Sequence, residues 1–145
     1  MRGIEIKFED CFDLTKYLAF EKLDLSNYIF WCVDSSAYHR SKTVELERQF
    51  TFQQLIELSK TSLVLERFHL QVHPIGEMPI SIKTYEEFLS SSCEMIVLVY
   101  DGVHLEIYAK FEHWINQLID NAQQIGKTSI SIKTKETDDR KEMYV

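Results

Sequence analysis

Glycine and proline are scarce in this chain of 145 residues, which contains four and two of them respectively. So few helix- and strand-breaking residues argue against long loops and low-complexity linkers. The longest apolar run, residues 95–100, is far shorter than the ~20 residues that a membrane helix needs. The first seven residues also lack the apolar stretch of a secretory signal, so we expect a cytoplasmic protein without a membrane partner.

Cysteine is sparse as well, and Cys11, Cys32 and Cys93 are widely spaced without a C-x-x-C pair. Such an odd, dispersed set is not the disulfide framework of a small secreted domain, which supports the cytoplasmic assignment. Basic residues are outnumbered, because 23 acidic and 16 basic residues give a net charge of −7. Nucleic-acid binding depends on clustered Lys and Arg, so this balance disfavours a nucleic-acid partner.

What the chain does contain is a succession of short apolar segments with regular periods. Alternating or continuous apolar residues predict strands, and apolar residues three or four apart predict helices. We expect strands at 3–8, 28–33, 63–72, 80–82, 95–100, 103–109 and 129–132. The structure of residues 38–47 is ambiguous, and a second, more polar strand is one alternative. We expect helices at 9–20, 51–60, 84–90 and 111–125. The predicted fold class is therefore α+β, with a mixed, largely antiparallel sheet and helices packed on one side.

Local signals sharpen some of these boundaries. Thr51, followed three residues later by Gln, matches a capping box at the start of a helix. Residues 34–36 predict a turn after the aromatic strand. Asp101-Gly102 suits a two-residue hairpin turn, which would pair Val99 with His104.

The domain organisation has two interpretations. Residues 1–133 are expected to form a single α+β domain, and residues 134–145 a charged, frayed C-terminal tail. The order β-α-β-β-α-β occurs twice, in halves 1–75 and 76–133, and the motif I-x-I-K opens each half at Ile4 and Ile80. The alternative is that I-x-I-K is simply what an amphipathic strand looks like, and both interpretations stay open.

Searches for catalytic, metal and cofactor motifs give negative results. The glycines are isolated, so no P-loop or dinucleotide fingerprint predicts a cofactor. His69 and His73 lie four positions apart on one face of a predicted strand, about 13 Å at ~3.3 Å per residue. Two side chains this far apart cannot bind one metal ion. We therefore expect both histidines to face solvent. Cys93 and His104 are about 20 Å apart on the predicted hairpin, too far for a nucleophile and its base. We therefore predict no catalytic and no metal-binding residues, which favours a non-enzymatic protein.

Three stretches of the sequence together resemble a known family. They are the opening M-R-G-I-E-I, the segment L-S-N-Y-x-x-W ending at Trp31, and T-Y-E-E-F-L-S from Thr84, followed by Cys93, an apolar strand and Ile107-Tyr108. The chain resembles a family of small uncharacterised proteins from spore-forming Gram-positive bacteria, defined only as a domain of unknown function. The resemblance extends to about residue 140 and implies a bacterial, cytosolic protein, but it carries over no catalytic or binding residues.

The best candidate for a ligand site combines Trp31 with Tyr38, His39 and Arg40, where polar side chains follow a buried aromatic strand. Loops held by rigid strands often carry function, although a plain surface loop is the alternative. The leading hypothesis is a non-enzymatic binding or interaction protein with a protein partner. The alternatives are a small-molecule-binding domain or enzyme with a pocket near Trp31 and Tyr38–Arg40, and a homo-oligomer that assembles through an exposed edge strand.

Overall fold

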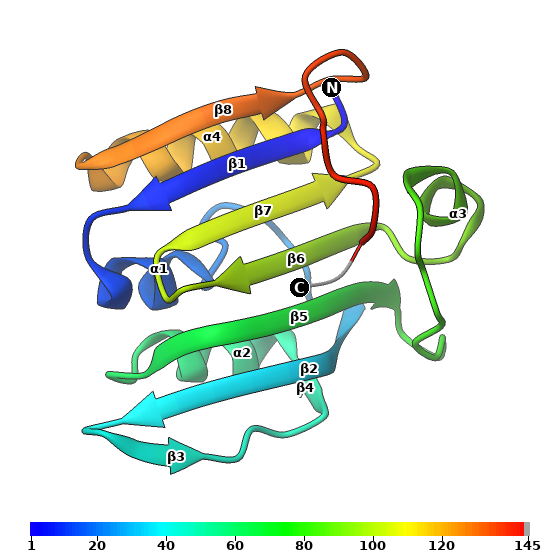
Figure 1. Ribbon diagram of the computed structural model, residues 1–145. Helices are drawn as coiled ribbons and strands as arrows, with labels where there is room; N and C mark the ends of the chain where they lie inside the picture. The colour runs from blue at the N-terminus through cyan, green and yellow to red at the C-terminus, as the bar shows by residue number, and fades with distance from the viewer. Residues whose placement is uncertain (144–145) are drawn as a thin grey trace.

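Antiparallel pairing joins every strand of the computed structural model, which describes residues 1–143, into one eight-stranded sheet. The sheet order is β3-β2-β5-β6-β7-β1-β8, and β4 pairs with β2 beside β3 (Figure 1). The strands are β1 (Gly3–Phe8), β2 (Tyr28–His39), β3 (Lys42–Val44), β4 (Gln49–Thr51), β5 (Val64–Pro74), β6 (Met95–Tyr100), β7 (His104–Ala109) and β8 (Thr128–Lys133). The sheet is open, because β8 and β3 occupy its two ends.

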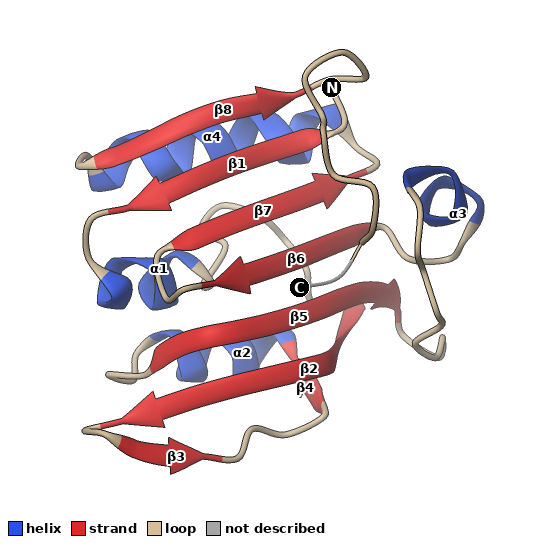
Figure 2. Cartoon of the chain, in the orientation of Figure 1, coloured by secondary structure: helices blue, strands red, loops and turns tan. Residues whose placement is uncertain are grey.

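Three helices cover one face of the sheet: α1 (Cys11–Tyr17), α2 (Phe52–Ser59) and α4 (Glu112–Ile125) (Figure 2). The short helix α3 (Tyr85–Ser90) lies to one side, and its Phe88 packs against side chains of the opposite face, which we call the outer face. The capping box predicted at Thr51 is present, with Thr51 and Gln54 each accepting a backbone hydrogen bond from the other residue. The predicted α+β class is confirmed.

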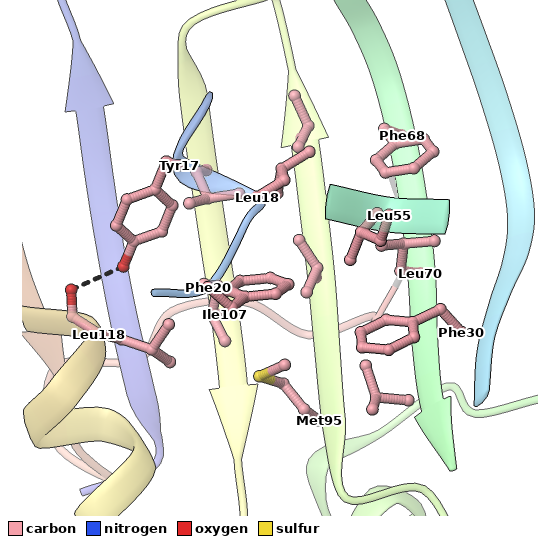
Figure 3. Packing of buried hydrophobic residues seen from close by; sticks show 14 of the residues in the cluster. Tyr17, Leu18, Phe20, Phe30, Leu55, Phe68, Leu70, Met95, Ile107 and Leu118 are labelled. Carbon is pink, nitrogen blue, oxygen red and sulfur yellow. Dashed lines mark hydrogen bonds between the residues drawn. The ribbon is translucent and has the colours of Figure 1, made fainter. Parts of the chain in front are cut away.

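The main core lies between the sheet and α1, α2 and α4 (Figure 3). Phe30 of β2 stacks between Phe20 and Phe52, with ring centroids 6.5 Å and 6.1 Å away. The buried hydroxyl of Tyr17 in α1 donates a hydrogen bond of 2.7 Å to the carbonyl of Leu118 in α4 (Figure 3). Aromatic packing and this bond tie the helices to each other and to the sheet.

Three local predictions are wrong. The turn expected at residues 34–36 does not form, because β2 continues to His39 with register shifts after Cys32 and Ser36. Residues 80–82, expected as a strand, are not part of the sheet. The β6–β7 hairpin pairs Tyr100, not Val99, with His104, so its loop has one residue more than expected.

The chain after β8 is not frayed over its described residues, so that prediction is also wrong. Residues 134–143 cross the outer face in front of β7 and β6 (Figure 1). Met143 is buried there, and its N–H donates to the carbonyl of Lys83 at 3.0 Å. The tail therefore packs onto the sheet despite its charge.

The prediction that His69 and His73 face solvent is wrong for a related reason. Both are buried, because the outer face of β5 lies under other chain segments. Gln71, between them, donates to the carbonyl of Ile80 at 2.6 Å, and His73 contacts Ser92 at 2.9 Å. The sequence pattern of a polar strand face does not predict its burial by a segment that is distant in the sequence.

The two sequence halves do not form separate sheets. β1, from the first half, lies between β7 and β8 of the second and pairs with both. The missing strand at residues 80–82 also removes the element that would match β1. The similarity between the I-x-I-K motifs is thus not matched by equivalent strands.

Replacing Gly3 with alanine should destabilise the fold. A Cβ at Gly3 would overlap the carbonyl oxygen of Ile107, a backbone atom of the adjoining strand β7. We expect Gly3→Ala to lower the free energy of unfolding by about 1–3 kcal/mol, the usual range for overpacking. Urea unfolding measures it, with exposed Ser131→Ala on β8 as the control. Equal stability of the two variants would show that β1 and β7 are not this close.

Candidate functional site

A groove lies on the helical side of the molecule, between α1 with the turn that follows it and α2. Its volume is about 700 Å³. It is lined by Lys16, Ala19, Phe20, Glu21, Lys22, Leu23, Phe52, Ile56, Ser59 and Lys60. We call it the α1–α2 groove.

The floor of the α1–α2 groove is part of the hydrophobic core. Phe20 is fully buried and Leu23 is 9% exposed. Phe52 and Phe20 both stack on Phe30, which lies on the sheet beneath them. The floor is therefore apolar and held in place by packing on both helices and the sheet.

The rim of the α1–α2 groove is basic, in a chain whose net charge is −7. Lys16 lies in the last turn of α1, Lys22 in the following turn, and Lys60 at the C-cap of α2. Lys60 makes one exposed contact of 3.4 Å with Glu57. Among residues 1–143, no carboxylate lies within salt-bridge distance of Lys16 or Lys22. Two of the three lysines can thus meet an anion without giving up an existing ion pair.

The backbone at this rim has an uncommon conformation. Phe20 and Lys22 have φ angles of 47° and 64°, in the left-handed region that glycine prefers. Hydrogen bonds of 3.1 Å, from the Phe20 N–H to the carbonyl of Tyr17 and from the Leu23 N–H to the carbonyl of Phe20, hold this turn. Strained conformations of this kind are often found at binding sites. The turn fixes where Lys22 leaves the chain.

The four residues predicted to form a ligand site do not come together. Trp31 lies near the start of β2, where its ring N–H donates to the carbonyl of Glu77 at 3.0 Å. Tyr38 and His39 end the same strand, and Arg40 follows in the turn to β3. Tyr38 lies seven positions after Trp31 on this strand, about 23 Å at ~3.3 Å per residue.

Trp31 does line a second groove, of about 500 Å³, which we call the Trp31 groove. Val33, Met78 and Ile80 contribute exposed apolar side chains to it, with exposed fractions of 44%, 63% and 47%. Arg48 supplies a positive charge at its border. The Trp31 half of the predicted site is therefore a concave, apolar surface.

A buried ionic cluster lies on the outer face. Glu106 of β7 contacts Lys133 of β8 at 2.6 Å and also forms an ion pair with Arg140 of the tail. Lys133 contacts Asp138 at 3.5 Å, and Asp138 accepts a hydrogen bond of 2.8 Å from the Tyr108 hydroxyl. Burial raises the pKa of Glu106, but the hydrogen bonds from Arg140 and Lys133 outweigh it and the pKa is lowered. These groups satisfy one another, so the cluster attaches the tail to the sheet.

The two buried thiols, those of Cys32 and Cys93, offer little nucleophilic character. Burial raises the pKa of Cys93 to about 12, and burial also raises the pKa of Cys32. Within the described part of the chain, no group of three or more His, Cys, Asp and Glu side chains is placed to hold a metal ion. Nor does any helix among residues 1–143 combine the length and apolar character needed to cross a membrane.

Comparison with known proteins places the chain in a family. The sequence pattern described as "Protein of unknown function (DUF2691)" matches residues 1–144. The chain belongs to the DUF2691 family. This confirms the resemblance to an uncharacterised family.

A DUF2691 relative comes from a spore-forming bacterium. The chain is 24% identical to "Uncharacterized protein YncE" of Bacillus subtilis (strain 168), over 99% of both proteins. No solved structure matches the chain.

Sequence reasoning missed the α1–α2 groove of this DUF2691 protein. Lys16, Lys22 and Lys60 come from two helices and a turn, and the last two are 38 positions apart in the sequence. The available signal was the short stretch in which Lys16 and Lys22 flank the apolar pair Ala19-Phe20. That pattern also fits an ordinary amphipathic helix end, so it could not identify a site without the fold.

Proposed function

We propose that this protein is a non-enzymatic binding protein whose α1–α2 groove holds an anionic ligand with an apolar portion. The observation that carries the proposal is the convergence of Lys16, Lys22 and Lys60 above an apolar floor. Ligand sites are typically concave and mostly apolar, with a few polar groups that orient the ligand. This groove has that composition.

The charge distribution supports an anionic ligand. Three lysines and one glutamate line the groove, whereas the whole chain carries seven more acidic than basic residues. A ligand carboxylate near the lysines would gain charge-assisted hydrogen bonds. Its apolar portion would gain about 25 cal/mol per Å² of apolar surface buried against Phe20 and Phe52. Acidic residues elsewhere on the surface would repel anions from other sites.

A second candidate function is protein–protein interaction through the Trp31 groove. Its exposed Val33, Met78 and Ile80 surround an indole ring, and Trp and Met are enriched at protein interfaces. A partner with apolar side chains would fit this surface. This proposal uses a different face of β2 from the one that supports the α1–α2 groove, so one substitution can separate them.

Titration with decanoate tests the first proposal. We expect decanoate to bind with measurable heat in calorimetry and decanol, its uncharged counterpart, to bind more weakly. Lys22→Gln should raise the decanoate dissociation constant about fivefold, because one charge-assisted contact of about 1 kcal/mol is lost. Lys16→Gln should have a similar effect.

Two matched variants give the controls. Lys42→Gln removes an exposed lysine of β3, away from both grooves, and should leave decanoate binding unchanged. Met78→Glu alters the Trp31 groove and should also leave it unchanged. Equal binding of decanoate and decanol, or loss of binding in Met78→Glu alone, would reject the α1–α2 groove as the site.

A further inference from the structure

The outward edge of β8 is open in the described structure. β8 pairs with β1 along its full length, from Thr128 opposite Phe8 to Lys133 opposite Gly3. Among residues 1–143, no strand pairs with its other side, and Figure 1 shows β8 at the end of the sheet. A strand edge of this kind presents unpaired backbone groups to a partner.

The hydrogen bonds of β8 show which of its residues face outward. The N–H of Arg2 donates to the carbonyl of Lys133 at 2.7 Å, so the backbone of Lys133 faces β1. Backbone groups along an edge strand alternate in direction. The N–H and C=O groups of Thr128, Ile130 and Ile132 therefore point away from the sheet.

This edge lacks the features that usually block pairing. Its register with β1 is continuous, and it contains no proline and no charged residue before Lys133. Ile132 is 45% exposed. The opposite end of the sheet is different, because β3 has three residues and the neighbouring β2 has two register shifts. Short strands, bulges and charges protect edges, and β8 has fewer of these protections.

We propose that β8 pairs with β8 of a second copy of this chain, antiparallel and about a two-fold axis through Ile130. Ile130 then lies opposite Ile130 of the second copy, and Thr128 lies opposite Ile132. This register places each outward residue opposite another outward residue, so each pair can exchange both of its backbone hydrogen bonds. It also covers the exposed Ile132 side chain with the methyl group of Thr128 from the second copy.

One existing contact lies on this edge and is compatible with the pairing. The hydroxyl of Thr137 donates to the carbonyl of Ile132 at 3.1 Å. A carbonyl oxygen has two lone pairs, so it can accept a second hydrogen bond from the partner strand. The partner strand would lie beside β8, in the plane of the sheet.

The dimer should be weak and dependent on concentration. A six-residue strand buries little surface, and stable interfaces bury about 1,200–2,000 Å² in total. Part of α4, which packs behind β8, would approach its counterpart and add to the area. The assembly would extend one sheet across two chains.

Sedimentation velocity across a wide concentration range tests the proposal. The mass should rise from 17.2 kDa toward twice that value as the concentration rises. Ile132→Lys should raise the dimer dissociation constant at least about tenfold, because it places a charge where an apolar side chain would be covered by the second copy. Thr128→Glu combined with Ile132→Lys should restore the dimer, since the two side chains lie opposite each other only between copies.

Two further variants separate the edge from general effects of charge and folding. Ser131→Lys adds the same charge to the outer face of β8 and should leave the dimer constant within about twofold. Thr128→Lys should weaken the dimer as Ile132→Lys does. It replaces Ile132→Lys in the test if circular dichroism shows that Ile132→Lys does not fold. A wild-type mass that stays at one chain, a dimer that persists in both lysine variants, or failure of the double variant to restore it would overturn the proposal.

Discussion

Replacing Glu106 with alanine is expected to lower the free energy of unfolding by about 3–5 kcal/mol, the range for breaking a buried ion pair. Glu106 is 4% exposed and pairs with both Lys133 and Arg140. Lys133 is also 4% exposed, so its charge would remain buried with Asp138 as its nearest acidic contact, at 3.5 Å. The penalty arises chiefly from these desolvated charges.

Urea unfolding of wild type and Glu106→Ala at neutral pH gives the measurement. Glu57→Ala is the matched control, because Glu57 forms an exposed pair with Lys60 and its loss should cost less than about 1 kcal/mol. The stability from Glu106 should be present above its unfolded pKa and lost as pH falls through its lowered folded pKa. Similar costs for the two alanine variants would contradict a buried cluster.

The second large effect concerns pH and His69. Burial lowers the pKa of His69 from 6.5 to about 4, with Asp34 opposing the shift and Arg140 adding to it. Among the described residues, its Nε2 has no hydrogen-bond partner. Below pH 6.5 the unfolded chain binds a proton that the folded chain does not, so stability falls until the pH reaches about 4. The loss from this one group amounts to about 3 kcal/mol.

His69→Gln should remove most of that pH dependence. The free energy of unfolding is measured with urea between pH 7 and pH 4. Over this range it should fall by about 3 kcal/mol less in the variant than in the wild type. The comparison uses the slope, so a constant cost of burying glutamine does not affect it. His113→Gln, at an exposed position of α4, should retain the wild-type slope. A wild-type slope in His69→Gln would show that the imidazole is solvated.

Local features of the sequence predicted the elements well. The capping box at Thr51 and the end of the last helix at residue 125 depend on neighbouring residues only, and both are present in the structure. Continuous apolar residues correctly predicted the strand β6, in which Met95 to Val99 are all fully buried. The hairpin at Asp101 was predicted with a register error of one residue, because loop length depends on how Tyr100 and His104 pair.

Burial by distant segments could not be predicted in this way. The alternation of β5 correctly assigned His69 to the face opposite Phe68, but solvent exposure was inferred from polarity alone. Only the fold shows that the outer face lies under residues 134–143 and the segment before α3. The candidate site also depends on contacts between distant segments, because the packing of α1 against α2 brings Lys22 and Lys60 to a common groove.

The position of β1 in the sheet has a consequence for how the chain folds. β1 is made before its neighbours β7 and β8, which begin 101 and 125 residues later along the chain. Ile4, Ile6 and Phe8, all buried in the finished sheet, have no strand to pair with until then. Contacts so distant in sequence slow folding. The antiparallel β2–β5 pair can form early, while completion of the sheet waits for the last strand to leave the ribosome.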